Sequence, residues 1–406
     1  AEMQTRSTFT SAGWDFTVID GDPFDWWMLV KSYPHLYWEP YYGGGSGTAE
    51  DPYQIWTAEQ MNTIGLNAPD WNKHFKLMAD IDMSVYTGTQ YNIIGNSDTK
   101  FTGVLNGNEH AIRNLAYTTG NAVDCIGLLG RIENAFIQNL GLENVSLSSE
   151  GKNIGGLVGW NDSSTLSACY MSGSVNGIGH VGGLVGRNDS GSLTACHAAG
   201  SVSGTNAIGG LAGGNYSGSL ENCYATGSVS GTGNYVGGVI GYNTKGKLTS
   251  CYTAASVGDT GSYVGGLVGW NSTGSTVTSC FWDAQASGIS TSAAGTEKTT
   301  EEMKKLSTFI SEGWDFTNET VNGTNDYWRM CIDDVDYPRL NWEYTNGDYA
   351  CPDGINTEDL SYYAGNWLMD NCSSDNNYCG GADLNYSGVV DLADWVIFAE
   401  NWLLGI

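Results

Sequence analysis

The stretch Ile154-Gly-Gly-Leu-Val-Gly-Trp-Asn161 is the first of five closely similar segments. The others begin at Val181, Ile208, Val236 and Val264, and each runs through a Ser/Gly turn to a cysteine. Their turn asparagines are separated by 27, 27, 28 and 28 residues. A near-constant period of this length is typical of a solenoid, in which each unit buries its apolar face against its neighbours.

The units contain the signals of strands and turns rather than of helices. Short apolar or β-branched runs alternate with Gly, Asn and Ser, which favour turns. Coils stacked in register lie about 4.8 Å apart, so that equivalent residues form columns. The asparagines and the cysteines form two such columns: Asn161, Asn188, Asn215, Asn243 and Asn271, and Cys169, Cys196, Cys223, Cys251 and Cys280. The sequence therefore predicts a mainly β protein built on a parallel β-helix.

The repeated pattern also resembles a known family. Val181-Gly-Gly-Leu-Val-Gly-x-Asn and the later run Cys223-Tyr-Ala-Thr-Gly-Ser-Val are similar to the GLUG repeat of large bacterial surface proteins, adhesins and some immunoglobulin A peptidases. The resemblance covers five units and implies a secreted β-helix. It implies no chemistry, because the repeat has no known chemistry of its own.

The charge of the chain limits its partners. There are 16 Lys and Arg against 44 Asp and Glu, which gives a net charge of −28. Such acidity argues against nucleic acid and anionic membrane as partners and favours divalent cations. No apolar stretch approaches the length of a membrane span. We expect an extracellular or cell-surface bacterial protein.

A second internal repeat occurs once near each end of the chain. Ser7-Thr-Phe-Thr-Ser-Ala-Gly-Trp-Asp-Phe-Thr17 reappears as Ser307-Thr-Phe-Ile-Ser-Glu-Gly-Trp-Asp-Phe-Thr317. The copy at 302–343 follows the last coil, where a solenoid needs a cap over its open end. The copy at 1–39 is either a remnant of a duplicated module or a segment that docks onto another subunit. Its aromatic residues are the candidate assembly interface: Trp14, Phe16, Trp26, Trp27, Tyr33 and Trp38. Docking of this kind would give head-to-tail homopolymers.

These features divide the chain into five parts. They are a cap-like module (1–42), a linker with a capping helix and the first coils (43–110), the repeat coils (111–287), a C-terminal cap (288–346) and a C-terminal module (347–406). A short capping helix is expected over Met61–Leu66, opened by Thr57-Ala-Glu-Gln60, which has the form of a capping box.

The C-terminal module contains a predicted metal site. Asp383, Asn385, Ser387, Asp391 and Asp394 place oxygen side chains at positions 1, 3, 5, 9 and 12 of a loop, with the carbonyl of Val389 at position 7. The loop and the helix that follows it resemble a dockerin calcium-binding repeat. This resemblance implies that the loop binds Ca²⁺ and that the module binds a cohesin-like partner. The preceding half keeps only Asp348, Asn356 and Asp359 at the ligand positions, so we expect it to bind calcium weakly or not at all.

The ten cysteines form two groups. Cys331, Cys351, Cys372 and Cys379 lie outside the coils, and three pairings are possible; we favour Cys331–Cys351 and Cys372–Cys379. The stacked coil cysteines and Cys125 are expected to stay unpaired and buried. Their Cβ atoms would lie about 4.8 Å apart, beyond the roughly 3.5–4.5 Å that a disulfide prefers.

The sequence gives little support for catalysis. Many β-helices cleave acidic polysaccharides, but coils 154–287 contain few charged residues, and no His-Glu-x-x-His occurs. Two aromatic columns remain as candidate surfaces. We expect the column after the cysteines (Tyr170, Tyr224, Tyr252, Phe281) to pack, and glycan binding stays open for Trp160, Tyr242 and Trp270.

Together these observations predict a non-enzymatic structural protein, a calcium-stabilised building block of an extracellular fibre or surface layer. The alternative is an adhesin or carbohydrate-associated module tethered through its dockerin-like end.

Overall fold

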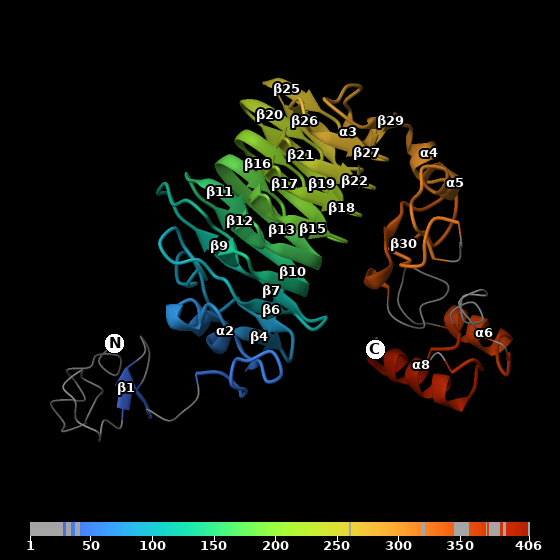
Figure 1. Cartoon of the computed structure of the whole chain (residues 1–406), viewed down its shortest axis with the longest axis horizontal. Coiled ribbons are helices and arrows are strands. Elements are labelled where there is room, and N and C mark those ends of the chain that lie inside the picture. The colour runs from blue at the N-terminus through green and yellow to red at the C-terminus, as the bar shows by residue number, and fades with distance from the viewer. Residues whose placement is uncertain are drawn as a thin grey trace.

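The computed structural model describes residues 27–29, 34–36, 41–259, 261–317, 321–344, 357–370, 372, 382–384 and 387–404. Its main body is a parallel β-solenoid of about seven turns, shown in Figure 1. The predicted parallel β-helix is thus confirmed. The helical C-terminal part is present, but its relation to dockerins stays a prediction.

One face of the solenoid is a six-stranded parallel sheet. Its strands are β9 (Leu129–Glu133), β12 (Val158–Asp162), β14 (Val185–Asp189), β17 (Ala212–Tyr216), β21 (Ile240–Thr244) and β26 (Val268–Asn271). Adjacent strands pair one repeat apart, for example Asn161 with Asn188. The sequence period is therefore also the register of the sheet.

The remaining coil strands pair in parallel around the other faces. They are β6 (Val104–Asn106), β7 (Ala111–Arg113), β8 (Ala116–Thr118), β10 (Phe136–Ser148), β11 (Lys152–Gly155), β13 (Thr165–Gly182), β15 (Ser192–Thr194), β16 (His197–Gly209), β18 (Ser219–Glu221), β19 (Tyr224–Gly231), β20 (Asn234–Gly237), β22 (Lys247–Thr249), β23 (Tyr252–Thr253), β24 (Ser256–Asp259), β25 (Ser262–Gly265), β27 (Thr276–Thr278) and β28 (Phe281–Asp283). Two short antiparallel pairs lie outside the coils: β1 (Trp27–Leu29) with β2 (Pro34–Leu36), and β30 (Trp328–Arg329) with β31 (Arg339–Leu340).

The N-terminal end of the solenoid is closed by the predicted helix. This helix is α2 (Ala58–Ile64), and the Thr57 side chain caps it by accepting a hydrogen bond from the Gln60 N–H. Met61 and Ile64 are buried in the solenoid core. The neighbouring elements are β3 (Tyr53–Ile55), η2 (Ala68–Asp70), β4 (His74–Leu77) and β5 (Ile81–Asp82).

Inside the coils, the two predicted columns are present. The five repeat cysteines are buried free thiols and Cys125 is a partly buried one, which confirms the expectation of unpaired coil cysteines. The asparagines form a chain of amide bonds, in which each Nδ2 donates to the Oδ1 of the next coil at 2.7–3.0 Å. Asn161, Asn188, Asn215 and Asn243 are completely buried.

The asparagine ladder also explains three glycines of the repeat. A Cβ on Gly191, Gly218 or Gly246 would lie 2.1–2.2 Å from the Nδ2 of the asparagine one coil earlier. Ser164 occupies the equivalent position of the first coil, where the preceding coil carries Ile132 in place of an asparagine. At these three glycines a side chain would meet the ladder, whereas in the last coil Ser275 occupies the position opposite Gly246.

The C-terminal end of the solenoid is closed by residues 284–298. Helix α3 (Ala284–Ser287) follows β28, and β29 (Thr296–Lys298) pairs with β28. Between them, the Ser292 hydroxyl accepts hydrogen bonds from the N–H groups of Leu267 and Val268.

Residues 299–317 and 321–344, here called the strap, lie along the flank of the solenoid. The strap contains α4 (Thr300–Met303), α5 (Leu306–Ile310), β30, β31 and η3 (Asn341–Glu343). Its buried side chains, Phe309, Trp314 and Trp328 among them, pack on the aromatic column formed by Tyr224, Tyr252 and Phe281. We expected this segment to cover the open end. It lies on the flank instead because the aromatic column exposes a second apolar surface there.

A buried carboxyl group joins the strap to the flank. Glu343 accepts hydrogen bonds from the Tyr224 hydroxyl (2.8 Å) and from the Leu340 N–H (2.7 Å). Burial raises the pKa of Glu343 to about 7. Burial, and next the charge of Arg339, lower the pKa of the neighbouring His197 to about 3. The 3.5 Å contact between His197 and Glu343 is therefore not an ion pair at neutral pH.

The C-terminal module has a small core of its own. Helices α6 (Thr357–Gly365) and α8 (Leu392–Leu404) contribute Tyr363 and Phe398, whose rings stack at 5.0 Å between centroids. Cys372, Ala382 and Val390 complete the cluster. Across the described ranges, no helix is long and apolar enough to span a membrane.

Candidate functional site

A pocket opens where two surface columns are interrupted in the same coil. The first column follows a corner of the solenoid at which the backbone has positive φ: Asn153, His180, Ala207, Tyr235 and Tyr263. The second lies on the six-stranded sheet: Trp160, Arg187, Gly214, Tyr242 and Trp270. Ala207 and Gly214 are the small members of these columns, and they lie seven residues apart in the sequence. One coil therefore lacks bulk at both positions.

Tyr216 partly fills this gap. Its hydroxyl lies 2.6 Å from His180 Nε2, and its ring contacts the Arg187 guanidinium on one side and the Tyr242 ring on the other. A cavity of about 260 Å³ remains, open to solvent. It is lined chiefly by Lys152, His180, Asn206, Tyr216, Tyr235 and Tyr242.

The electrostatics of the pocket are simple. Lys152 is the one charged residue in its lining, because burial, and next the charge of Arg187, lower the pKa of His180 to about 4. Burial also raises the pKa of Tyr216. At neutral pH the pocket thus offers a neutral imidazole, phenol groups, an amide and one ammonium group.

Further aromatic rings extend from the pocket along the solenoid. Tyr242 stacks on Trp270 at 4.6 Å, and Tyr235 stacks on Tyr263 at 5.3 Å between centroids. Tyr263 is 57% exposed. Trp160, at the other end of the column, is instead covered on both faces by the guanidinium groups of Arg131 and Arg187.

The aromatic column after the cysteines behaves as predicted. Tyr224, Tyr252 and Phe281 are buried beneath the strap, and Tyr170 lies at the strap's edge, where its ring contacts Trp342. This column is packing.

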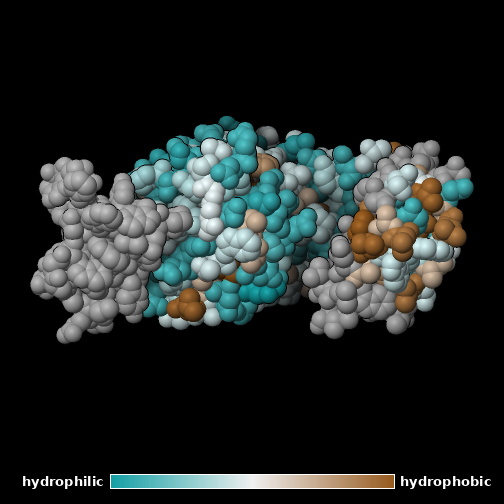
Figure 2. Space-filling model, turned by 90° about the horizontal axis from the view of Figure 1, so that it is seen from below, coloured by the Kyte–Doolittle hydropathy of each residue, from teal (hydrophilic) through white to brown (hydrophobic). Residues whose placement is uncertain are grey.

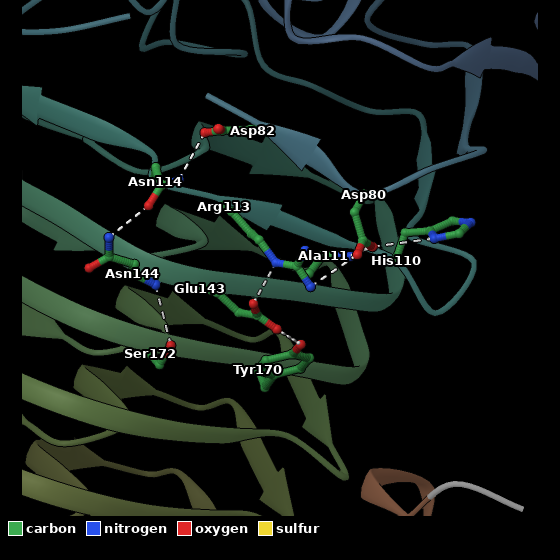
Figure 3. Close-up of polar contacts among 10 residues, drawn as sticks. All are labelled: Asp80, Asp82, His110, Ala111, Arg113, Asn114, Glu143, Asn144, Tyr170 and Ser172. Carbon is green, nitrogen blue, oxygen red and sulfur yellow. Dashed lines mark hydrogen bonds and ion pairs between the residues drawn. The ribbon is translucent and has the colours of Figure 1, made fainter. Parts of the chain in front are cut away.

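Beyond the edge of the strap, the same flank carries a polar row of Asp80, His110, Arg113, Glu143 and Tyr170, shown in Figure 3. Arg113 Nη2 lies 3.0 Å from Asp80 Oδ2, and its Nε donates to Glu143 Oε2 at 2.7 Å. The Tyr170 hydroxyl donates to Glu143 Oε1 at 2.7 Å, and His110 Nδ1 lies 3.4 Å from Asp80 Oδ1. Four consecutive coils thus place two carboxylates, a guanidinium, an imidazole and a phenol on one half-exposed face.

Sequence reasoning missed both groups. The regular coils 154–287 contain few charged residues, whereas the polar row belongs mainly to the irregular coils before them. Asp80, Arg113 and Glu143 are 33 and 30 residues apart, so no fixed period relates them. The pocket did leave a signal, because Ala-Gly-Gly-Asn215 replaces the Val-Gly-Trp-Asn161 of the first repeat.

The described calcium-loop residues form a hydrogen-bonded turn. Asp383 Oδ1 and Oδ2 accept from the N–H groups of Ser387 (2.9 Å) and Gly388 (2.8 Å), and Asp394 Oδ2 accepts from the Asp391 N–H (2.9 Å). Asp383 and Asp394 are almost completely buried, whereas Val389 is 38% exposed. Residues 347–406 contain ten acidic residues and no Lys or Arg. Among the described residues, no group of three or more His, Cys, Asp or Glu side chains is arranged to hold a metal ion, so the calcium site stays a prediction.

Other predicted residues are only partly placed. Cys331 and Cys372 are disulfide-bonded, but Cys351 and Cys379 lie outside the described residues, so the pairing stays a prediction. Of the predicted assembly interface, only the backbone of Trp27 is described; Trp14, Phe16, Trp26, Tyr33 and Trp38 lie outside the described residues. The same holds for the predicted calcium ligand Asn385 and for Asp348 and Asn356 of the degenerate half, whereas Asp359 is buried.

Comparisons with known proteins agree with the repeat and the fold. Residues 204–230 match the family described as "The GLUG motif". The chain is 34% identical over 115 residues to the "Putative Gly-rich membrane protein" of Evansella cellulosilytica, and 35% identical over 118 residues to Halomucin of Haloquadratum walsbyi. These alignments cover 27% and 28% of this chain but only 13% and 1% of the relatives. They indicate a surface or extracellular protein.

The fold is also that of a solved structure, "a putative immunoglobulin A1 protease from Bacteroides ovatus". The TM-score is 0.53 at 24% identity, over 74% of this chain and 96% of that chain. The expectation of a non-enzymatic protein is corrected by this finding, because a chain of the same fold bears the name of an enzyme. The expectation rested on the charge-poor coils 154–287, and the polar row lies mainly before them.

Proposed function

We propose that this chain is the β-helical part of an extracellular or surface protein that binds glycans through its exposed aromatic rings. The observation that carries the proposal is the aromatic face formed by Tyr235, Tyr242, Tyr263 and Trp270 beside an open pocket. Tyrosine and tryptophan rings stack on the C–H faces of sugars and keep a polar group at the rim. By contrast, the aromatic rings that serve only packing, Tyr224, Tyr252 and Phe281, are buried beneath the strap.

Binding to immobilised polysaccharides and to a glycan array tests this proposal. Tyr235→Ala and Tyr263→Ala should each weaken binding, because they remove stacking surface at a solvent-exposed corner. Trp56→Ala is the matched control, since Trp56 is 46% exposed near the N-terminal end of the solenoid, away from this face. Glycan binding that is equal in all three variants and the wild type would rule out the aromatic face.

We infer a second candidate function, hydrolysis, from the polar row. Arg113 holds one oxygen of Asp80 and one of Glu143, and the other oxygens contact His110 and Tyr170, whose side chains exchange protons. Paired carboxylates perform acid–base chemistry in glycoside hydrolysis. The protease name of the Bacteroides ovatus protein makes immunoglobulin A1 a second substrate to test.

Cleavage of acidic polysaccharides, neutral polysaccharides and immunoglobulin A1 is measured by the appearance of new chain ends. Glu143→Gln should reduce cleavage by about a hundredfold or more if Glu143 transfers a proton. Glu133→Gln, on the separate face formed by β9, is the control and should cleave normally. A Glu143→Gln protein as active as the wild type would exclude the polar row.

The C-terminal module supports a tethering role. Figure 2 shows apolar residues gathered over this end, and the exposed ones include Trp367, Leu368, Met369, Leu392 and Val396. We propose that Ca²⁺ held by Asp383, Ser387, Asp391 and Asp394 orders this surface, which then docks a cohesin-like partner. Calorimetry before and after chelation measures the calcium, and pull-down with the chelated protein as control measures the partner.

Assembly into a head-to-tail fibre or surface layer is a separate proposal. It rests on the sequence repeat between 1–39 and 302–343 and on the aromatic content of the first copy. Removal of residues 1–42 should leave a folded chain that no longer forms filaments in negative-stain microscopy. Filaments from the shortened chain would exclude this role for the segment.

A further inference from the structure

The pocket at Ala207 and Gly214 has the dimensions of a site for one sugar ring. The coils on either side of the interrupted coil lie about 9.6 Å apart, twice a rise of about 4.8 Å. Side chains from these outer coils, His180 below and Tyr235 and Tyr242 above, form the walls of the gap. The cavity of about 260 Å³ is below the range of roughly 300–1,000 Å³ that is typical for drug-sized ligands.

The lining of the pocket carries a positive charge and no negative charge. Its lining has no Asp or Glu, although the protein carries 44 acidic residues. Three arginines of the coils, Arg113, Arg131 and Arg187, are paired with carboxylates. In the part of the chain that the structure describes, no carboxylate forms an ion pair with the Lys152 ammonium group. A lone ammonium at an aromatic pocket selects an anionic group on the ligand.

We propose that this pocket binds a carboxylate-bearing sugar, such as a uronic acid residue of an acidic glycan. The sugar ring lies against the tyrosine faces, its hydroxyl groups bond to Asn206 and the Tyr216 hydroxyl, and its carboxylate bonds to Lys152. This inference rests on the proposed glycan-binding function and adds to it the class of sugar and the place where it binds.

The pocket also assigns a role to two small residues. A Cβ at Gly214 would lie 2.7 Å from His180 Cδ2 and 2.9 Å from Tyr216 Cε2, so a side chain there would displace two residues that line the pocket. Ala207 has φ of 54°, close to the 67° of Tyr235 and the 65° of Tyr263 in the next two coils. A tyrosine at position 207 would therefore fit the backbone of the corner and fill the pocket. Gly214 and Ala207 determine specificity by their size.

Titration calorimetry on the full chain with methyl glucuronide and methyl glucoside tests the inference. The glucuronide should bind about tenfold or more tightly than the glucoside, because a hydrogen bond to a charged group is worth about 1.5–3 kcal/mol. Lys152→Gln should remove this preference and leave the weaker binding of the neutral sugar. Lys247→Gln, on β22, is the matched control and should keep the preference.

Two pocket-filling variants locate the site. Ala207→Tyr and Gly214→Trp copy residues that other coils carry at the same columns, and both should abolish glucuronide binding while the circular dichroism spectrum is kept. Retention of binding in Ala207→Tyr would overturn the inference even if Gly214→Trp fails to fold. Equal affinity for the two sugars, unchanged in Lys152→Gln, would overturn the inference but leave the glycan-binding function intact. Absence of binding to every sugar and polysaccharide would overturn both.

Discussion

Asn215 lies in the middle of the asparagine ladder, and its replacement by alanine tests what holds the coils together. Its Nδ2 donates to Asn243 Oδ1 (3.0 Å) and to the Gly218 carbonyl (3.1 Å), and its Oδ1 accepts from Asn188 Nδ2 (2.8 Å). Asn215→Ala removes all three bonds in a site that water does not reach. Asn188 Nδ2 still donates to the Gly191 carbonyl and the Gly218 carbonyl still accepts from the Lys247 N–H, whereas Asn243 Oδ1 is left buried without its donor. A lost hydrogen bond is worth about 0.5–1.5 kcal/mol and a buried group left unpaired costs about 1–3 kcal/mol, so we expect a loss of about 2–6 kcal/mol.

Asn271 provides the matched control because it ends the ladder. Only Asn243 Nδ2 donates to it, at 2.7 Å, and Asn271 is half-buried, so that water can replace the lost acceptor. We expect Asn271→Ala to cost about 1 kcal/mol. Urea unfolding followed by far-ultraviolet circular dichroism gives both free energies, provided that the m-value is unchanged. Losses within about 0.5 kcal/mol of each other would refute the argument that buried amide bonds stabilise the ladder.

Three further outcomes are expected. Gly218→Ala should destabilise the coils by about 1–3 kcal/mol in the same urea assay, because its Cβ would lie 2.2 Å from Asn188 Nδ2; a neutral effect would mean that the ladder shifts freely. Because burial raises the pKa of Glu343 from 4.5 to about 7, its contribution to stability is full below pH 4.5 and is lost as the pH rises through 7. The advantage of the wild type over Glu343→Gln should therefore shrink by about 1.4 kcal/mol per pH unit across that window, and a constant difference would contradict the buried acid. Chelation of calcium should selectively melt residues 347–406 in calorimetry. If chelation leaves the melting transition of this module unchanged, the predicted calcium site is wrong.

Much of the solenoid's structure could be predicted directly from its sequence repeats. In a stack of coils, residues one period apart are neighbours in space, so the spacing of Asn161 and Asn188 is also their pairing in the sheet. The same rule predicted the buried thiols and the packing of the aromatic column, whereas the capping box predicted the helix at the N-terminal end. The prediction of a non-enzymatic protein, which was based on the regular coils alone, is corrected by the likeness of the fold to a chain that bears the name of a protease.

What the sequence alone determined is the part of the molecule in which contacts are local and periodic: the parallel β-helix, its register and its ladders. Only the tertiary structure placed the strap on the flank, because the sequence showed an end-cap repeat but not which apolar surface it covers. Only the tertiary structure brought Asp80, Arg113 and Glu143 together, since irregular coils of different length set no common period. The pocket likewise depends on Ala207 and Gly214 lying side by side on neighbouring columns, a relation that exists once the coil is folded and its corner is turned.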